Sequence, residues 1–366
     1  KRIRKSQPLP ISAPPPEQIH IFPDELDPQS WTSKHPPLPV FDAAVNIPLK
    51  WNIPVIAIFV ALIAVSGTWG MDNVEENIDL LGMAPEDEPA VKKMKQYSSE
   101  NKKLAIDVCD PAGINALNNN YNYKITNAQK FIEIARSIKS DDEIICMKAS
   151  VKTAEKGIVL MHKNLKAGMT EEELWSILHK TNIENGGEWF ETRLLNSGPK
   201  TNPWFQECSS RIIQKGEIVA FDTDMVGPYG YCADISRAFV EGHKFNEDQK
   251  KLYLMAVEHI NHNSRLIKSG MSFKEFTEKS WKLPDEYYGN RYSCMVHGIG
   301  LCDEWPMIRY PTDGGQREGS FEKNMTVTVE SYIGKVGGKE GVKLEQQYLV
   351  GEHNLEIMSH HPLEHI

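Results

Sequence analysis

The chain has 366 residues, of which 40% are hydrophobic and 25% charged, close to the average of globular proteins. Fibrous, collagen-like and wholly disordered classes are therefore excluded. The 41 basic and 50 acidic residues leave a net charge of −9, so no overall positive field attracts phosphate backbones and no nucleic acid is expected as a partner. The six cysteines form no CxxC pair, which indicates reduced thiols rather than a disulfide framework or a zinc ribbon.

Residues 1–50 are predicted to form a proline-rich extended arm. They hold 11 of the 22 prolines, together with a basic cluster at residues 1–5. Proline at this density is incompatible with helices and with central strands, because it lacks a backbone N–H and fixes φ.

An uncharged segment follows at residues 51–71. Its length could span a bilayer, and Trp51 and Trp69 stand near its two ends, as interfacial tryptophans do. However, the uninterrupted apolar part covers only the 13 residues 53–65 and contains Pro54. A buried core segment in a cytoplasmic protein is therefore favoured, with a membrane anchor through 51–71 as the alternative.

The chain beyond residue 72 has an α/β pattern. A small N-terminal α/β domain is predicted over residues 51–138. Its expected elements are a charged helix over 84–100, a strand over 103–108, a short helix over 112–120 and an amphipathic helix over 128–138.

Residues 139–366 are predicted to form a second domain of two helix layers against a curved sheet. A long helix is expected over 143–163, and the capping box of Thr170 with Glu173 starts another. Ser272 with Glu275 forms a second pattern of the same kind. The repetition indicates either an internal duplication or only that capping boxes are common. The regions 189–240 and 325–351 have the residue types of strands and hairpins.

Three aspartates are expected to meet on one hairpin. Asp222 and Asp224 end an apolar strand at positions i and i+2, and Asp234 belongs to a second apolar strand beyond a Gly-Pro-Tyr-Gly turn. Carboxylates that face one another need a cation or a shared proton. A metal site is the simplest solution.

Further ligand candidates lie in the C-terminal region. His297 stands in a Val-His-Gly-Ile-Gly segment, and Glu330 and Glu345 each follow an apolar or β-branched run. One imidazole with several carboxylates suits two hard or borderline ions such as iron, manganese or zinc.

The order of these residues resembles that of the pita-bread metalloenzymes, which include methionine aminopeptidase, prolidase and creatinase. The resemblance implies a C-terminal pita-bread domain, with a curved antiparallel sheet and two helix pairs, preceded by a smaller, truncated α/β domain. It also implies a dinuclear metal centre in which either Asp222 or Asp224 bridges. The implied ligands are Asp222, Asp224, Asp234, His297, Glu330 and Glu345.

Two departures from the peptidase pattern argue against simple peptide hydrolysis. Peptidases of this fold carry a second histidine seven residues after the first, whereas the segment His297–Pro306 is one residue shorter and has Asp303 at that place. The peptidases also keep an 11-residue spacing between their two aspartates. Here Asp222 and Asp224 precede Asp234 by 12 and 10 residues.

A narrower resemblance accounts for both departures. The chain is similar to the DddP-type dimethylsulfoniopropionate lyases from about residue 103 to 361. The matching strings are Gly187–Leu195, Ser197–Pro199, Thr201–Glu207, Phe221–Asp224 and His297–Pro306. The resemblance implies cleavage of a small sulfonium carboxylate, dimethylsulfoniopropionate, to dimethyl sulfide and acrylate at a centre of two iron ions, with zinc or manganese as alternatives. A homodimer is also implied.

The chemistry of this reaction suggests roles around the metal centre, and for Tyr292 the role comes from the resemblance. Asp303 is expected to be the base that removes the Cα proton, and Tyr292 to contact the substrate. Trp189, Trp204 and Trp305 are expected to hold the sulfonium through cation–π attraction. The alternative function is that of a dinuclear aminopeptidase or Xaa-Pro dipeptidase that tolerates the loss of the second histidine.

Overall fold

The computed structural model describes residues 102–363, apart from 110, 120–121 and 315–317. The arm predicted over 1–50, the apolar segment 51–71 and the helix predicted over 84–100 lie outside these residues. Among the helices that the structure describes, none is long and apolar enough to cross a membrane.

The described chain begins with a small parallel βαβ unit. Strands β1 (Lys103–Ile106) and β2 (Lys124–Asn127) pair in parallel, and helix α6 (Pro111–Asn119) makes the crossover that parallel neighbours require. Leu104, Ile106 and Tyr123 form its small apolar core. The strand and the helix predicted from the sequence in this region are both present.

Helices α7 (Gln129–Ser137), α8 (Asp141–Asn164) and α9 (Glu171–Glu184) follow. Helix α8 begins with a complete capping box of Ser140 and Glu143, and α9 with the predicted box of Thr170 and Glu173. In each box the hydroxyl accepts from the N3 backbone N–H while the glutamate accepts from the N-cap N–H, which satisfies two otherwise unpaired donors.

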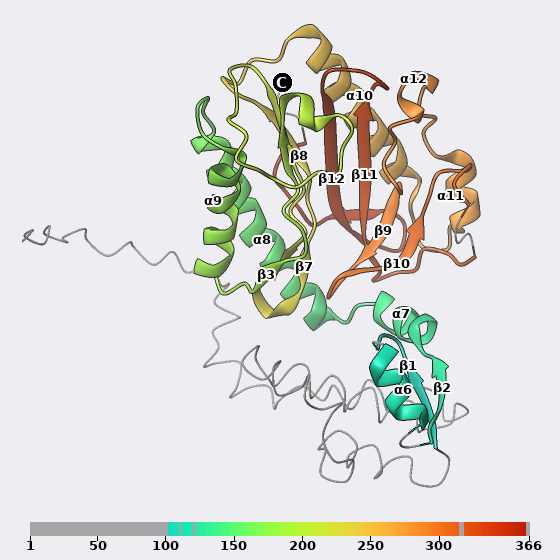
Figure 1. The fold of residues 1–366 in the computed structure, drawn as a ribbon. Helices are drawn as coiled ribbons and strands as arrows, with labels where there is room; N and C mark the ends of the chain where they lie inside the picture. Colours follow the sequence, from blue (N-terminus) through green and yellow to red (C-terminus); the bar gives the residue numbers. More distant parts are fainter. Residues whose placement is uncertain (1–101, 110, 120–121, 315–317, 364–366) are drawn as a thin grey trace, which may run out of the picture. The chain divides into compact units, whose positions relative to one another are not determined.

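A second helix pair lies further along the chain. Helix α10 (Glu247–Leu266) is followed by α11 (Phe273–Lys279) and by the short α12 (Asp285–Tyr288). Ser272 caps α11 by accepting a hydrogen bond from the Glu275 backbone N–H, as the sequence predicted. In Figure 1, α10 runs along β11 and β12 of the largest sheet, and these elements are in contact.

The largest sheet of the described chain is antiparallel, with the strand order β10-β9-β11-β12-β13. Two three-stranded sheets have the orders β4-β5-β8 and β3-β6-β7. The strands of the largest sheet are β9 (Val296–Ile299), β10 (Asp303–Ile308), β11 (Thr326–Gly334), β12 (Gly341–Val350) and β13 (Leu355–Ile357). Those of the smaller sheets are β3 (Trp189–Phe190), β4 (Leu195–Ser197), β5 (Ile218–Phe221), β6 (Met225–Val226), β7 (Cys232–Ala233) and β8 (Arg237–Val240). The single-turn 3₁₀ helices are Gly198–Thr201 and Pro228–Gly230.

The apolar side chains of this region form two large clusters. One contains residues of α10, α11 and the long strands, and the other contains residues of α8, α9 and the smaller sheets. Strand β12 contacts both β5 and β8. The ends of the short strands therefore come close to β12, and this is where the acidic residues gather.

Candidate metal centre

The β6–β7 hairpin brings the three predicted aspartates together. Met225 of β6 pairs with Ala233 of β7, so that Asp224 and Asp234 flank the same cross-strand pair. The Thr223 hydroxyl donates to the Ala233 carbonyl at 2.7 Å and accepts from the Ile235 N–H at 2.9 Å, which fixes the two segments to each other. Oxygens of Asp222, Asp224 and Asp234 lie within 4.8 Å of one another.

The register of the largest sheet supplies the other ligand candidates. Glu330 of β11 stands directly opposite Glu345 of β12, and His297 of β9 stands opposite Thr328. Because side chains two residues apart in a strand share a face, Thr328 and Glu330 place His297 beside both glutamates. His297 Nε2 lies 3.2 Å from Glu330 Oε1 and 3.3 Å from Glu345 Oε1.

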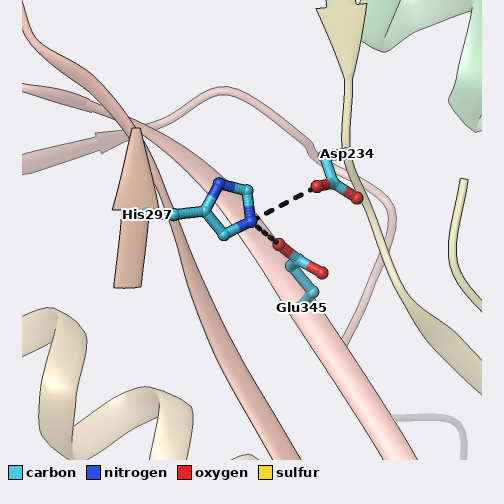
Figure 2. Close-up of side chains that lie close together, drawn as sticks. All are labelled: Asp234, His297 and Glu345. Atoms are coloured by element: carbon cyan, nitrogen blue, oxygen red, sulfur yellow. Dashed lines mark ion pairs between the residues drawn. The ribbon is translucent and has the colours of Figure 1, made fainter. Parts of the chain in front are cut away.

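Figure 2 shows how the hairpin meets the sheet. Asp234 and Glu345 both approach the Nε2 edge of the His297 ring, with Asp234 Oδ2 at 3.5 Å. On the other edge of the ring, Nδ1 lies 2.9 Å from the Gly298 carbonyl oxygen. An Nδ1–H that donates to this carbonyl leaves the Nε2 lone pair directed at the carboxylates, as a metal-binding histidine requires.

Burial makes this cluster of acids electrostatically unfavourable unless cations are present. Burial and, after it, the charge of the neighbouring Glu345 raise the pKa of Glu330 to about 7, although Lys343 and His297 act in the opposite direction. Burial and the surrounding carboxylates likewise raise the pKa values of Asp224 and Asp234 well above their usual range. Burial lowers the pKa of His297, but Asp303, Glu330 and Glu345 outweigh this effect and raise it well above its usual value.

A lysine that sequence reasoning missed lies in the middle of the cluster. Lys343 is fully buried, and its Nζ lies 2.9 Å from Asp222 Oδ2, 3.0 Å from Glu330 Oε2 and 2.7 Å from Glu345 Oε2. The signal in the sequence was its position two residues before Glu345 in a strand, which puts both side chains on one face. Burial lowers the pKa of Lys343, but Asp222, Glu330 and Glu345 raise it well above its usual value, so the ammonium stays charged.

The donor set fits metal ions. Asp222 Oδ1 and Asp234 Oδ1 are buried and have no hydrogen-bond partner among the described residues, a costly state that a cation would relieve. The six predicted ligands form three overlapping groups: Asp234 with His297 and Glu345, Asp222 with Asp224 and Asp234, and Asp222 with Glu330 and Glu345. One imidazole and five carboxylates suit hard or borderline ions, and the overlapping groups offer room for more than one of them.

Asp303 lies next to this centre but outside the ligand groups. Its Oδ1 is 3.6 Å from His297 Nδ1, on the opposite edge of the ring from Asp234 and Glu345, and its side chain is 48% exposed. Asp303 therefore differs from the proposed ligands in being open to solvent, as a base that exchanges protons must be.

The segment that carries Asp303 is held by two cations from the α7 region, which sequence reasoning also missed. The buried Glu304 accepts from Arg136 Nη2 at 2.5 Å, from Lys139 Nζ at 2.7 Å and from the Leu301 N–H at 3.0 Å. Arg136 lies near the end of α7 and Lys139 just beyond it. The spacing of these residues in the sequence gave no indication that they meet.

The aromatic residues predicted to contact the substrate separate into exposed and packed groups. Trp189 is 57% exposed. Trp204 is buried against Tyr332, with ring centroids 6.4 Å apart, and Trp305 packs edge-on against Phe273 at 5.1 Å. The packing of these two tryptophans favours a structural role over substrate contact.

Tyr292 lies beside the centre, with its ring centroid 4.6 Å from Lys343 Nζ, and its contact with the substrate stays a prediction. Its ring centroid is 6.3 Å from that of Phe205, a side chain that is 65% exposed and that sequence reasoning passed over. Phe205 has a φ of +82°, in the left-handed region that bulky residues rarely adopt. Strained backbone of this kind is often found at functional sites.

Two other side chains near the centre were not predicted. The buried Cys294 thiol donates to Glu330 Oε1 at 2.9 Å. The Glu191 backbone N–H donates to the Asp224 carbonyl at 2.9 Å, and burial followed by the charge of Asp303 raises the pKa of the Glu191 carboxyl. Glu191 thus brings a second non-ligand carboxyl close to Asp303.

The sequence model of metallopeptidase family M24 matches residues 145–352, which include all six ligand candidates. The chain belongs to this family. Membership identifies the curved sheet and its two helix pairs as the pita-bread fold, as predicted from the sequence, and M24 is a metal-dependent family.

Solved structures of family members share this fold. The prolidase from Pyrococcus horikoshii matches with a TM-score of 0.65 and 25% identity, over 75% of this chain and 80% of the prolidase. The X-Pro aminopeptidase from Thermotoga maritima matches with a TM-score of 0.63 and 22% identity, over 75% of this chain and 76% of that one.

The curated relatives are more similar in sequence. A dimethylsulfoniopropionate lyase DddP from Roseovarius nubinhibens is 38% identical over 278 residues, and one from Roseobacter denitrificans is 38% identical over 284 residues. Each match covers 74% of this chain. The chain spans about 62% of the length of these two relatives. The narrower resemblance seen in the sequence is therefore confirmed.

Proposed function

We propose that the protein is a metal-dependent lyase that cleaves dimethylsulfoniopropionate to dimethyl sulfide and acrylate. The observation that carries the proposal is the position of Asp303, a solvent-open carboxylate beside His297 at the place where the peptidase pattern has its second histidine. The 38% identity to two dimethylsulfoniopropionate lyases supports the same substrate.

The reaction requires one proton acceptor and one leaving group. In the proposed step, the Asp303 carboxylate removes a proton from the carbon next to the substrate carboxylate. The electron pair of that C–H bond forms the C=C bond of acrylate, while the C–S bond breaks and its electron pair leaves with neutral dimethyl sulfide. Proton transfer to a positioned carboxylate contributes about 10²- to 10⁴-fold in rate.

The residues of the chain divide the remaining tasks. Metal ions held by the six ligand candidates would bind the substrate carboxylate and stabilise the negative charge that develops next to it. Glu304, Arg136 and Lys139 hold the strand end on which Asp303 stands. Iron is the proposed metal, with zinc and manganese as alternatives, and the proposed assembly is a homodimer.

The sulfonium end of the substrate needs a site that favours a soft cation without forming a covalent bond. Tyr292 and Phe205 are neighbouring aromatic rings at the edge of the centre, and Trp189 is a further exposed ring on β3. A cation against an aromatic face gains about 0.5 to 2 kcal/mol. We therefore assign the sulfonium to the side of the site lined by Tyr292 and Phe205.

The test compares two substrates on the full chain reconstituted with Fe²⁺ under anaerobic conditions. Gas chromatography of dimethyl sulfide and liquid chromatography of acrylate should show equal amounts of the two products from dimethylsulfoniopropionate. Hydrolysis of Xaa-Pro dipeptides is measured in parallel. Dipeptide hydrolysis without dimethyl sulfide would overturn the lyase proposal in favour of a dipeptidase.

The Asp303→Asn variant tests the base within the same assay. It keeps the size of the side chain but removes its basicity, so we expect the rate to fall about 10²-fold or more while the metal content stays unchanged. Full activity of Asp303→Asn would rule out Asp303 as the base, and Glu191 would then be the next carboxylate to replace.

A further inference from the structure

We propose that Lys343 is a positioning residue that serves as the fixed internal cation of the metal centre. In this role its ammonium donates hydrogen bonds to one oxygen each of Asp222 and Glu345 and lies 3.0 Å from one oxygen of Glu330 as an ion pair. It thereby holds the acidic cluster folded when no metal is bound, and the second oxygen of each carboxylate stays on the side that faces away from the ammonium. The proposal concerns the centre itself and does not depend on the substrate.

Lys343 contacts only one of the two oxygens of each neighbouring carboxylate. Lys343 Nζ approaches Oδ2 of Asp222 and Oε2 of both Glu330 and Glu345. The second oxygens point elsewhere. Glu330 Oε1 and Glu345 Oε1 lie near His297 Nε2, and Asp222 Oδ1 is buried without a partner among the described residues. One ammonium thus orients three of the six ligand candidates toward the position that a metal ion would take.

The position of Lys343 is itself fixed from several directions. Its three N–H donors are used by Asp222 Oδ2, Ser236 Oγ at 2.7 Å and Glu345 Oε2, the maximum that an ammonium offers. The Tyr292 ring lies 4.6 Å from Nζ. A fully buried lysine with every donor satisfied is a structural part of the site rather than a side chain that swings in from solvent.

The charges of the cluster also balance when Lys343 is included. With metal bound, the five carboxylates would be ionised, and together with the ammonium they would carry a net charge of −4, which two divalent ions would cancel. Without metal, the ammonium is the buried cation that reaches Asp222, Glu330 and Glu345 at once. Removing one partner of a buried ion pair leaves uncompensated charge in a medium of low dielectric constant, which is strongly destabilising.

The experiment measures thermal unfolding of the full chain in two states, after dialysis against EDTA and after reloading with Mn²⁺. The Lys343→Met variant should unfold about 10 °C below the wild type when metal-free, and less than half as far below it when Mn²⁺ is bound, because the ions then supply the missing positive charge. Lys343→Arg, which keeps the charge and the donors, should restore most of the metal-free stability.

A matched control separates this role from ordinary core stabilisation. Lys139 is also a buried lysine in an ion pair, but its partner Glu304 is not a ligand candidate. Lys139→Met should therefore lower the unfolding temperature equally in both states. Equal losses in both states for Lys343→Met would overturn the proposal.

A second neutral variant covers the case in which Lys343→Met does not fold. Lys343→Gln retains a hydrogen-bond donor but has no charge, so it should show the same metal-dependent loss as Lys343→Met. Wild-type stability of metal-free Lys343→Gln would show that the charge is not what the site requires. Failure of both neutral variants to fold even with Mn²⁺ would show that metal ions do not replace the ammonium, and either outcome would overturn the proposal.

Discussion

Glu330 and Glu345 stand directly opposite each other on neighbouring antiparallel strands. Like charges in this position destabilise a sheet, and here both side chains are buried as well. His297 Nε2 and Lys343 Nζ lie on either side of the pair, each within 3.3 Å of both glutamates. The positive charges of these two side chains therefore offset the repulsion between the two buried glutamates.

The first prediction concerns metal binding by this pair. Glu330→Gln keeps the size of the side chain but removes one charged ligand, and we expect metal affinity to fall at least about 10-fold. Plasma mass spectrometry of the dialysed protein gives the metal content per chain. Glu356→Gln, on the exposed end of the same sheet, is the control and should retain the wild-type content. Unchanged metal content in Glu330→Gln would remove Glu330 from the ligand set.

The second prediction is a pH dependence of the metal-free protein. The pKa of Glu330 is about 7 in the folded chain, above the ordinary value of 4.5. A raised pKa contributes stability that is complete below the unfolded value and is lost as the pH rises through the folded value. Asp234 and His297, whose pKa values are also raised, act in the same direction. The metal-free protein should therefore lose about 2.5 kcal/mol of unfolding free energy between pH 5 and pH 8 from Glu330 alone.

Urea unfolding of the EDTA-treated protein at the two pH values checks this sign. Metal ions favour the ionised carboxylates, so the stabilisation by Mn²⁺ should grow over the same interval. Stability of the metal-free protein that rises from pH 5 to pH 8 would contradict the assignment of buried, raised-pKa carboxyls to this centre.

The third prediction concerns the support of the proposed base. Arg136→Met removes one cation from the buried Glu304, so the strand end that carries Asp303 should lose its fixed position. We expect the turnover of dimethylsulfoniopropionate to fall about 10-fold, since small misplacements of a catalytic group are costly, with metal content unchanged. The exposed pair of Lys148 with Glu356 offers a control, and Lys148→Met should leave turnover unaffected.

The fourth prediction concerns the aromatic edge of the site. Phe205→Leu keeps an apolar side chain but removes the ring face. The KM for dimethylsulfoniopropionate should rise about 3- to 10-fold, the loss expected for one cation–π contact, while kcat changes little. A carboxylate of the same shape in which a neutral CH group replaces the sulfonium, used as a competitive inhibitor, should bind the variant and the wild type equally. Equal weakening of the sulfonium substrate and of the analogue without the sulfonium would indicate a shape effect instead.

Much of the centre follows from local patterns in the sequence. The three aspartates are predictable because a turn between two apolar strands forces their side chains together, and the capping boxes at Thr170 and Ser272 mark helix starts through bonds within one turn. Such features depend on residues close in the chain, so the sequence carries them directly.

The contacts that were missed join residues far apart in the sequence. Lys343 meets Asp222 across 121 positions, and Arg136 meets Glu304 across 168. A distant contact also decides the place of Trp204. Its residue type and its neighbours in the sequence are typical of a ligand-binding surface, but it packs against Tyr332 in the core. Which distant elements meet is decided by the assembled sheet, and no periodicity in the chain records it.

The attachment of Glu304 to Arg136 and Lys139 bears on where the catalytic unit begins. A boundary at residue 139, drawn from the sequence pattern, assigns Arg136 to the preceding domain, although its guanidinium and the Lys139 ammonium are the two cations that neutralise Glu304 within the described chain. A fragment that starts at residue 140 would keep all six ligand candidates and Asp303, yet it would leave Glu304, directly beside Asp303, without its two cationic partners. The smallest functional unit of this protein therefore includes α7, and an expression fragment should begin ahead of it.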